Sequence, residues 1–289
     1  NFWDGDICWA TLVDTKSKYL YDTSKKISQL GLEKSSAKLL PINTVIFSSR
    51  ASIGEVSIAK VATSTNQGFK NFICDDSKIH YEYLYEVLKF YAKNIEHLAG
   101  GMTFKEVSKT SIANFKIPLP PLDIQQKIVQ ECEAIDNQRE QAQSLIAQLE
   151  NNISSIIQNV SGDRIKIGSL YSYSKMRIQA DLLNADTYVG VDNLLPNTKG
   201  KKPSEFVPNS GTVTQYGIGD VLLSNIRPYL KKIWLADIVG GASNDVLVLK
   251  RQSENIREKY FFYNLKQDQF FEYSMLGKKG VKMPRGDKN

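Results

Sequence analysis

The sequence has few of the residues on which most metal sites and nucleophilic active sites depend. It contains three cysteines, Cys8, Cys74 and Cys132, and two histidines, His80 and His97. The cysteines are far apart, odd in number and form no CxxC pair, which predicts reduced thiols in a cytosolic protein. The histidines have no HxxxH spacing and no evident Ser/Asp partners. We expect these five residues to pack in the core or lie on the surface.

Catalytic motifs are also missing. The sequence has no glycine-rich phosphate loop and no Asn/Asp-Pro-Pro-aromatic motif of the kind that amino-methyltransferases carry. The adjacent carboxylates Asp75 and Asp76 are more typical of a loop than of a metal site. We therefore expect no catalytic residue, no metal and no cofactor on this chain by itself.

Long apolar runs are absent as well. None approaches the roughly 18 residues needed to cross a bilayer, and no signal-peptide pattern follows Asn1. These absences predict a cytoplasmic protein with no membrane partner, and the missing initiator methionine suggests that Asn1 is not the natural start. The 289 residues, 42% hydrophobic and 24% charged, suit about two globular domains. The net charge of +6 permits an anionic partner.

A long helix is predicted near the middle of the chain. Three prolines within 114–122 exclude a helix there, whereas 124–160 contains neither glycine nor proline. Asp123 is the expected N-cap and Gln126 is in the capping-box position. Ser161 and Gly162 supply the stop signal. About 37 residues at 1.5 Å each give a helix of roughly 55 Å.

The apolar residues of this segment recur every seven positions, as in a coiled coil. Segment 124–160 also has a net charge of −3, so the rest of the chain carries +9. We therefore expect the helix to be a spacer that contacts protein rather than DNA; the alternative is an ordinary packed helix. The residues expected to meet a partner are Ile128, Ile135, Ile146, Leu149, Ile153 and Ile156.

The segments on either side of the helix are similar to each other at an offset of 176–178 residues. Such an offset indicates two copies of one folding unit. The matching pairs are Asn43–Arg50 with Gly219–Arg227, Val56–Ala59 with Ile233–Ala236, Ser64–Phe69 with Ala242–Leu247, Tyr83–Tyr85 with Tyr260–Phe262 and, more loosely, Ala99–Lys105 with Leu276–Lys282.

The offset also predicts what each copy lacks. The second copy opens with 164–170, which is predicted to be a strand and has no counterpart in the first copy. It stops near the counterpart of Ser111, without the proline-rich segment and helix that would follow. We predict a first domain at 1–118 without its N-terminal strand, a spacer at 119–160, and a second domain at 161–289 without its following helix.

Several segments, taken in order, resemble the specificity (S) subunit of type I restriction-modification systems. The first copy supplies Asn1–Trp9, Ser35–Pro41, Ser48–Gly54, Thr65–Lys70, Phe104–Ser108 and Ile117–Gln126, and the second supplies Gly219–Ser224 and Lys282–Arg285. The resemblance implies an α+β fold. Two similar target-recognition domains, each a small mixed β-sheet plus helices, would be separated by a long helix of the coiled-coil type.

The same resemblance implies a division of labour among subunits. Each recognition domain would read one half of a bipartite target in double-stranded DNA, and the helices would bind two methyltransferase (M) subunits. S-adenosylmethionine, ATP and Mg would be expected only on partners: the M subunits, which methylate adenine, and the restriction/translocase (R) subunits. The alternatives are a specificity module of a fused or two-subunit type II enzyme, a coiled-coil scaffold that binds no DNA, and a two-domain enzyme with an inserted helical arm.

Candidate DNA contacts are polar or basic residues in expected loops, because base edges and phosphates are bound by such side chains. In the first copy they are Ser49, Arg50, Asn66, Gln67, Lys70, Thr103 and Lys105. In the second copy they are Lys199, Lys201, Lys202, Asn225, Arg227, Lys231, Asn244, Lys278, Lys279, Lys282 and Arg285.

Overall fold

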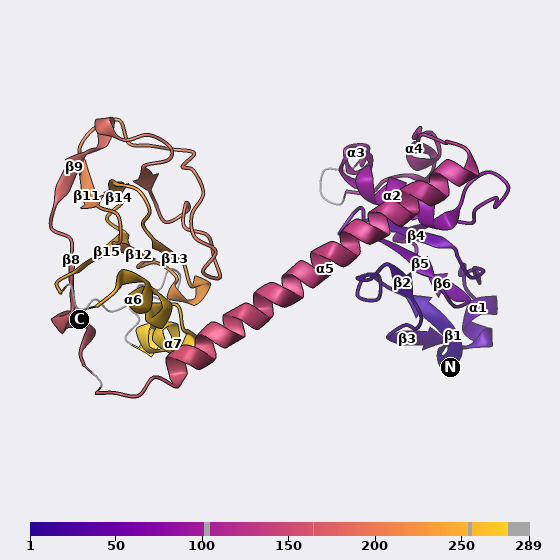
Figure 1. Cartoon of the computed structure of the whole chain (residues 1–289). Helices are drawn as coiled ribbons and strands as arrows, with labels where there is room; N and C mark the ends of the chain where they lie inside the picture. The colour runs from indigo at the N-terminus through magenta and orange to yellow at the C-terminus, as the bar shows by residue number, and fades with distance from the viewer. Residues whose placement is uncertain (101–104, 164, 254–255, 277–289) are drawn as a thin grey trace. The chain divides into compact units, whose positions relative to one another are not determined.

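The computed structural model has a mixed α+β fold and consists of two compact units, Asn1–Ser144 and Leu145–Asn289 (Figure 1). It describes residues 1–100, 105–163, 165–253 and 256–276. Within those ranges no helix is long and apolar enough to span a membrane. The helix α5 (Leu122–Gln158) contributes residues to both units.

The described residues of unit 1 form two small sheets and four short helices ahead of α5. Its elements are β1 (Trp3–Ala10), β2 (Tyr19–Leu20), β3 (Lys25–Ile27), α1 (Gln29–Glu33), β4 (Val45–Ser48), β5 (Val56–Ala59), β6 (Thr63–Thr65), β7 (Phe69–Phe72), α2 (Tyr81–Phe90), α3 (Ala92–Glu96) and α4 (Lys109–Ala113). The sheet orders are β2-β5-β4-β7 and β3-β1-β6. The largest core cluster packs β4 and β5 against α2, with Phe47, Ile58 and Leu88 at its centre.

Unit 2 is also built from two small sheets. Its elements are η1 (Ile167–Ser169), β8 (Tyr171–Tyr173), β9 (Arg177–Gln179), η2 (Ala180–Leu182), β10 (Tyr188–Val189), β11 (Thr212–Tyr216), β12 (Val221–Ser224), η3 (Pro228–Leu230), β13 (Ile233–Leu235), β14 (Gly240–Ala242), β15 (Val246–Arg251), α6 (Glu258–Leu265) and α7 (Asp268–Leu276). The sheet orders are β13-β12-β15-β8 and β10-β14-β11-β9. The strand predicted at 164–170 was misplaced, because η1 occupies part of that segment and β8 begins only at Tyr171.

The two units share the order and register of five strands, which confirms that they have similar folds, whereas the edge strands of their sheets differ. The three neighbouring strands β5-β4-β7 correspond to β13-β12-β15, and the parallel pair β1-β6 corresponds to β10-β14. Equivalent residue pairs are Val45–Ile58 with Val221–Leu235, Ser48–Phe69 with Ser224–Val246, Ala10–Thr65 with Val189–Ala242, and Leu40–Thr63 with Tyr216–Gly240.

Left-handed backbone positions repeat as well. The pairs with positive φ are Asn43 (64°) with Gly219 (85°), Ala51 (56°) with Arg227 (51°), and Gly54 (99°) with Lys231 (49°). Non-glycine residues seldom adopt this conformation, so its recurrence at one offset shows that the turns, and not only the strands, are repeated. It also corrects one alignment: the counterpart of Arg227 is Ala51, and not Arg50.

The long helix begins earlier and ends earlier than predicted. Asp123 is the second residue of α5 rather than its N-cap, because the first turn closes on the Pro121 carbonyl, which accepts the amides of Ile124 and Gln125. Proline has no N–H but its carbonyl still accepts hydrogen bonds, so it can stand directly before a helix. The last helical residue is Gln158.

Gln125 and several charged residues fix the N-terminal part of α5 to unit 1. The fully buried Gln125 side chain accepts the His80 amide at 2.9 Å and donates to the carbonyls of Lys78 (2.9 Å) and Pro120 (2.8 Å). Ion pairs link Lys18 to Glu133 (3.0 Å) and Lys89 to Asp136 (3.6 Å). Beyond these contacts, residues 137–152 are all exposed.

Candidate nucleic-acid interface

In unit 1, three loops meet at one edge of the sheets. They are 11–14 after β1, 49–54 after β4 and 66–68 after β6. The first and third are adjacent because β1 and β6 are parallel and end together at Ala10 and Thr65. The second joins them because the Ser49 amide donates to the Gly68 carbonyl at 2.8 Å.

Unit 2 brings the equivalent loops together. These are 190–193 after β10, 225–231 after β12 and 243–245 after β14. β10 and β14 are parallel and end at Val189 and Ala242, and the Asn225 amide donates to the Asp245 carbonyl at 2.9 Å. Each unit therefore presents one edge made of three loops, which we call the loop edge.

The loop edge of unit 1 carries more basic than acidic charge. Arg50 lies 2.8 Å from one Glu106 carboxylate oxygen and Lys70 lies 3.2 Å from the other. These hydrogen bonds, that from Arg50 foremost, lower the pKa of Glu106. The neighbouring Lys105 is exposed. Two cations thus pair with the Glu106 carboxylate and a third, Lys105, lies next to it in the sequence, an arrangement suited to an anionic ligand.

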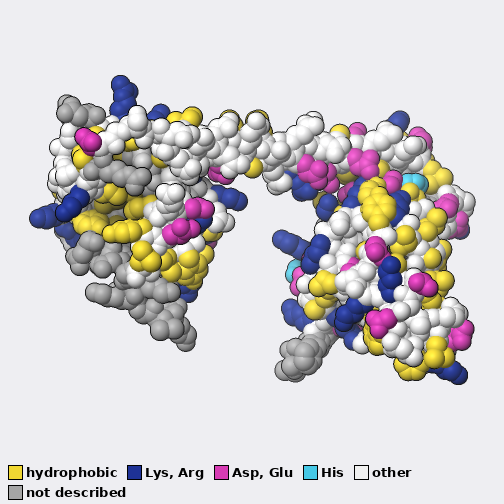
Figure 2. Space-filling model, turned by 90° about the horizontal axis from the view of Figure 1, so that it is seen from below, with side chains coloured by type: hydrophobic (Ala, Val, Ile, Leu, Met, Phe, Trp, Pro, Cys, Tyr) yellow, Lys and Arg dark blue, Asp and Glu magenta, His cyan; other side chains and the backbone are white. Residues whose placement is uncertain are grey.

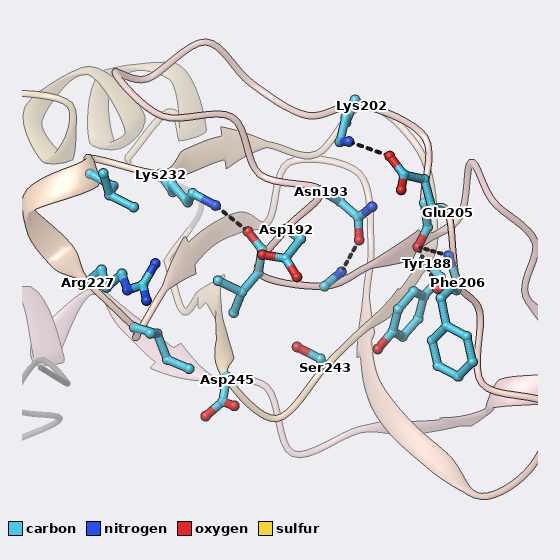
Figure 3. A pocket seen from close by; sticks show the side chains of 15 residues that line it. Tyr188, Asp192, Asn193, Lys202, Glu205, Phe206, Arg227, Lys232, Ser243 and Asp245 are labelled. Atoms are coloured by element: carbon cyan, nitrogen blue, oxygen red, sulfur yellow. Dashed lines mark hydrogen bonds and ion pairs between the residues drawn. The ribbon is translucent and has the colours of Figure 1, made fainter. Parts of the chain in front are cut away.

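The loop edge of unit 2 is hollowed into a pocket of about 570 Å³ (Figure 3). Its charged lining residues are Lys202, Arg227, Lys232, Asp192, Glu205 and Asp245, and its aromatic ones are Tyr188 and Phe206. Lys202 pairs with Glu205 at 2.8 Å, and Lys232 donates to the Val191 carbonyl at 2.7 Å. Burial lowers the pKa of Lys232. Because the cations and carboxylates of the lining are equal in number, the pocket has little net charge to attract a phosphate. It is better suited to a ligand that both donates and accepts hydrogen bonds.

The structure places most of the predicted site residues on or beside the loop edges, and basic side chains are visible on both units (Figure 2). Gathered there are Arg50, Asn66, Gln67, Lys70, Lys105, Lys202, Arg227 and Asn244. Lys199 is exposed but does not line the pocket. Lys201 lies 5.1 Å from the centre of the Trp234 ring and donates to the Asp186 carbonyl, so it is held within unit 2. Lys231 pairs with Asp268 of α7 at 2.7 Å.

Two of the predicted contacts lie inside the loop edge and not on its surface. Ser49 and Asn225 are buried, at 0% and 5% exposure, because each backbone amide bridges to the neighbouring loop. The Ser49 hydroxyl also donates to the Gly68 carbonyl at 3.0 Å and accepts from Lys70 at 3.1 Å. Both residues hold the loop edge together from inside. The predicted contacts Thr103, Lys278, Lys279, Lys282 and Arg285 lie outside the described residues.

Sequence reasoning missed Asp192 and Lys232, although both line the pocket. The signal for Asp192 was present in the turn after the strand. Thr11–Asp14 and Gly190–Asn193 both place a short side-chain acceptor three residues beyond the first position, at an offset of 179. The similarity was missed because Thr11–Asp14 and Gly190–Asn193 have different residues at every matching position. Within the described residues, no group of acidic, histidine or cysteine side chains could hold a metal ion.

Of the six α5 residues expected to meet a partner, four are exposed and two, Ile128 and Ile153, contact other parts of the chain. Ile135, Ile146, Leu149 and Ile156 are exposed, at 51–66%. Ile128 does not belong with them, because it packs against Tyr83 and Val87 of its own unit. Ile153 is half-buried and lines a groove with Lys266 and Asp268 of unit 2.

The chain belongs to the family described as the type I restriction modification DNA specificity domain, whose sequence profile matches residues 3–151. It is 36% identical over 132 residues to the type I restriction enzyme MjaIX specificity subunit of Methanocaldococcus jannaschii, covering 44% of this chain and 30% of that protein. It is 27% identical over 142 residues to the EcoR124I/EcoR124II specificity subunit of Escherichia coli, covering 47% and 35%.

These matches span about a third of the length of those relatives. The fold is also similar to the crystal structure of a type I restriction-modification S subunit from M. genitalium. The TM-score is 0.50 at 14% identity, covering 93% of this chain and 76% of that one.

Proposed function

We propose that the chain recognises a bipartite DNA target as the specificity subunit of a type I restriction-modification complex. The observation that carries the proposal is the repeated loop edge. Two units with the same strand register each present three converging loops, and the loops of the two units differ in their side chains. Two readers with one framework and different loops suit a target with two different halves. We assign the recognition domains to 1–118 and 161–289 and the spacer to 119–160.

The helix α5 is proposed to dock the partner subunits. Beyond its first turn, its exposed large apolar residues are Ile135, Leu145, Ile146, Leu149 and Ile156. Water-exposed apolar side chains in a row on one helix favour association with another protein surface. Two M subunits would bind there, and R subunits would join them in the full complex. S-adenosylmethionine, ATP and Mg would bind to those partner subunits and not to this chain. On this view, the purified chain transfers no labelled methyl group to DNA.

The decisive experiment maps methylated adenines in DNA from cells that carry the intact system and from cells in which this gene is deleted. The proposal requires a bipartite methylated sequence that disappears with the deletion. A motif that persists without the gene would contradict it. A binding titration across salt adds a second criterion, because specific recognition should survive salt concentrations that abolish phosphate-only binding.

A further inference from the structure

The turn after the first parallel strand places one residue at the same point of both units. In unit 1 the Thr11 amide donates to the Asp14 carboxylate at 2.8 Å, and the Asp14 amide donates to the Thr11 carbonyl at 3.0 Å. In unit 2 the Gly190 amide donates to the Asn193 side chain at 2.7 Å, and the Asn193 amide donates to the Gly190 carbonyl at 3.1 Å. The third residues of these turns, Val13 and Asp192, are therefore equivalent.

A second equivalent position lies in the loop after β4 and β12. The Ser48 hydroxyl donates to the Arg50 carbonyl, and the Ser224 hydroxyl donates to the Ile226 carbonyl, both at 2.9 Å. The next residues, Ala51 and Arg227, both have positive φ, 56° and 51°. The same backbone thus presents alanine in unit 1 and arginine in unit 2.

In unit 2 both positions carry charged side chains, and the Asp192 carboxylate lies near enough to Lys202 and Lys232 to act on both ammonium groups electrostatically. Asp192 and Arg227 are exposed and line the same pocket from different loops (Figure 3). Across the described part of the chain, neither side chain forms an ion pair or a hydrogen bond. Their neighbours Lys202 and Lys232 do have partners, Glu205 and the Val191 carbonyl. A ligand in this pocket could bond the Arg227 guanidinium and the Asp192 carboxylate without displacing an internal hydrogen bond of either side chain.

In unit 1 the same positions are apolar. Val13 is 70% exposed and Ala51 is also exposed. Nothing in the core of unit 1 explains an exposed valine at the tip of a turn. The two units therefore differ in chemistry at two positions where their backbones agree.

We propose that these two positions determine base preference: Asp192 and Arg227 read a C·G base pair, and Val13 and Ala51 contact a thymine methyl group. The proposal rests on the proposed function. Arginine donates two hydrogen bonds to guanine O6 and N7, a carboxylate accepts from cytosine N4, and small apolar side chains contact the thymine methyl. A C·G pair offers the acceptors and the donor that the free Arg227 and Asp192 require.

The test selects DNA from libraries randomised in one half-site at a time, using the full chain and its Arg227→Ala and Asp192→Asn variants. Each variant should lose roughly tenfold or more of its preference for C·G at one base pair of the unit 2 half-site, and keep the other half-site unchanged. Arg227→Ala should fold normally, because Ala51 already adopts the same conformation in unit 1. Asp237→Asn is the matched control, since this exposed residue follows β13 at the opposite end of the strands.

The reciprocal variant Val13→Asp with Ala51→Arg should convert one T·A preference of the unit 1 half-site into a C·G preference. If Arg227→Ala and Asp192→Asn bind with unchanged base preference, or weaken all sequences equally, the inference is wrong although the chain still recognises DNA. If the parent chain enriches no sequence at all, the proposed function itself fails. The parent chain is included in the same selection, so that loss of base preference in a variant can be told apart from absence of any DNA recognition.

Discussion

Among single residues, Gln125 anchors the start of α5 through a fully buried side chain. That side chain satisfies the His80 amide and the carbonyls of Lys78 and Pro120. We expect Gln125→Leu to lower the free energy of unfolding of unit 1 by about 2–4 kcal/mol, because three partly buried backbone groups lose their partner. The adjacent Gln126 is exposed, so Gln126→Leu should change it by less than about 0.5 kcal/mol in the same urea titration. Equal effects would show that Gln125 is not the anchor.

Tyr171 presents the opposite case, a buried polar atom without a partner. Among the described residues, its hydroxyl has no hydrogen bond, and the ring stacks on Phe261. Tyr171→Phe should therefore raise the free energy of unfolding by about 1 kcal/mol. Burial raises the pKa of Tyr171 to about 12. A raised pKa gives stability that is complete below the ordinary value of 10.0 and is lost as pH rises through 10 to 12. The difference in free energy of unfolding between Tyr171→Phe and the parent chain should therefore increase over that range. Thermal unfolding of both proteins at pH 8 and at pH 11 measures it.

Among the elements, α5 depends on Lys18 for its docking to unit 1. Burial alone would lower the pKa of Lys18, but hydrogen bonds to Glu133 and Glu86 raise it. Lys18→Met should reduce the free energy of unfolding by about 1–2 kcal/mol at pH 7, since hydrogen bonds between charged groups are lost. Because the pKa is raised, the difference from the parent should shrink as pH rises above 10.5. Lys16→Met, which removes an exposed pair with Glu55, is the control and should have little effect.

The exposed row on α5 is expected to serve assembly rather than folding. Ile146→Asp and Leu149→Asp should leave the melting temperature unchanged, because both side chains are exposed in the free chain. Each should weaken association with an M subunit at least tenfold, because a carboxylate would be buried without a partner. Gln148→Asp, also exposed on the same helix, is the control. Sedimentation of the mixture measures assembly, and an unchanged complex would place the interface elsewhere.

The sequence predicts these elements better than it predicts their contacts. The constant offset between the two copies identified equivalent strands, because buried apolar strands keep their spacing. It did not show that Ser49 and Asn225 turn inward, since that depends on which loop each amide meets. Nor did it distinguish Gln125 from Gln126, because the helix began at Leu122 rather than after Asp123. Arg50 was aligned with Arg227 because the two residues are identical, whereas the backbone conformation shows that Ala51 is the position equivalent to Arg227.

For the whole molecule, the repeated units predict that damage to one loop edge leaves recognition by the other intact. Arg50→Ala should weaken only the half-site read by unit 1. A base contact would cost about 1–3 kcal/mol at one position, whereas a phosphate contact would weaken all sequences and reduce the salt dependence. Binding to libraries randomised in one half at a time measures this. Equal changes in both half-sites would contradict separate recognition by the two units.

The exposed middle of α5 has a consequence for how the chain fluctuates. Residues 137–152 bury none of their side chains, and the ion pair of Glu150 with Lys266 at 3.6 Å is partly exposed. An isolated helix of this size is only marginally stable in water. The order of residues 137–152 must therefore be propagated from the packed turns on either side. Amide hydrogens at 137–152 should exchange with solvent much faster than those at 122–136, where Gln125 and Val129 are buried. A bound partner would slow that exchange, so the stiffness of the helix would be acquired on assembly.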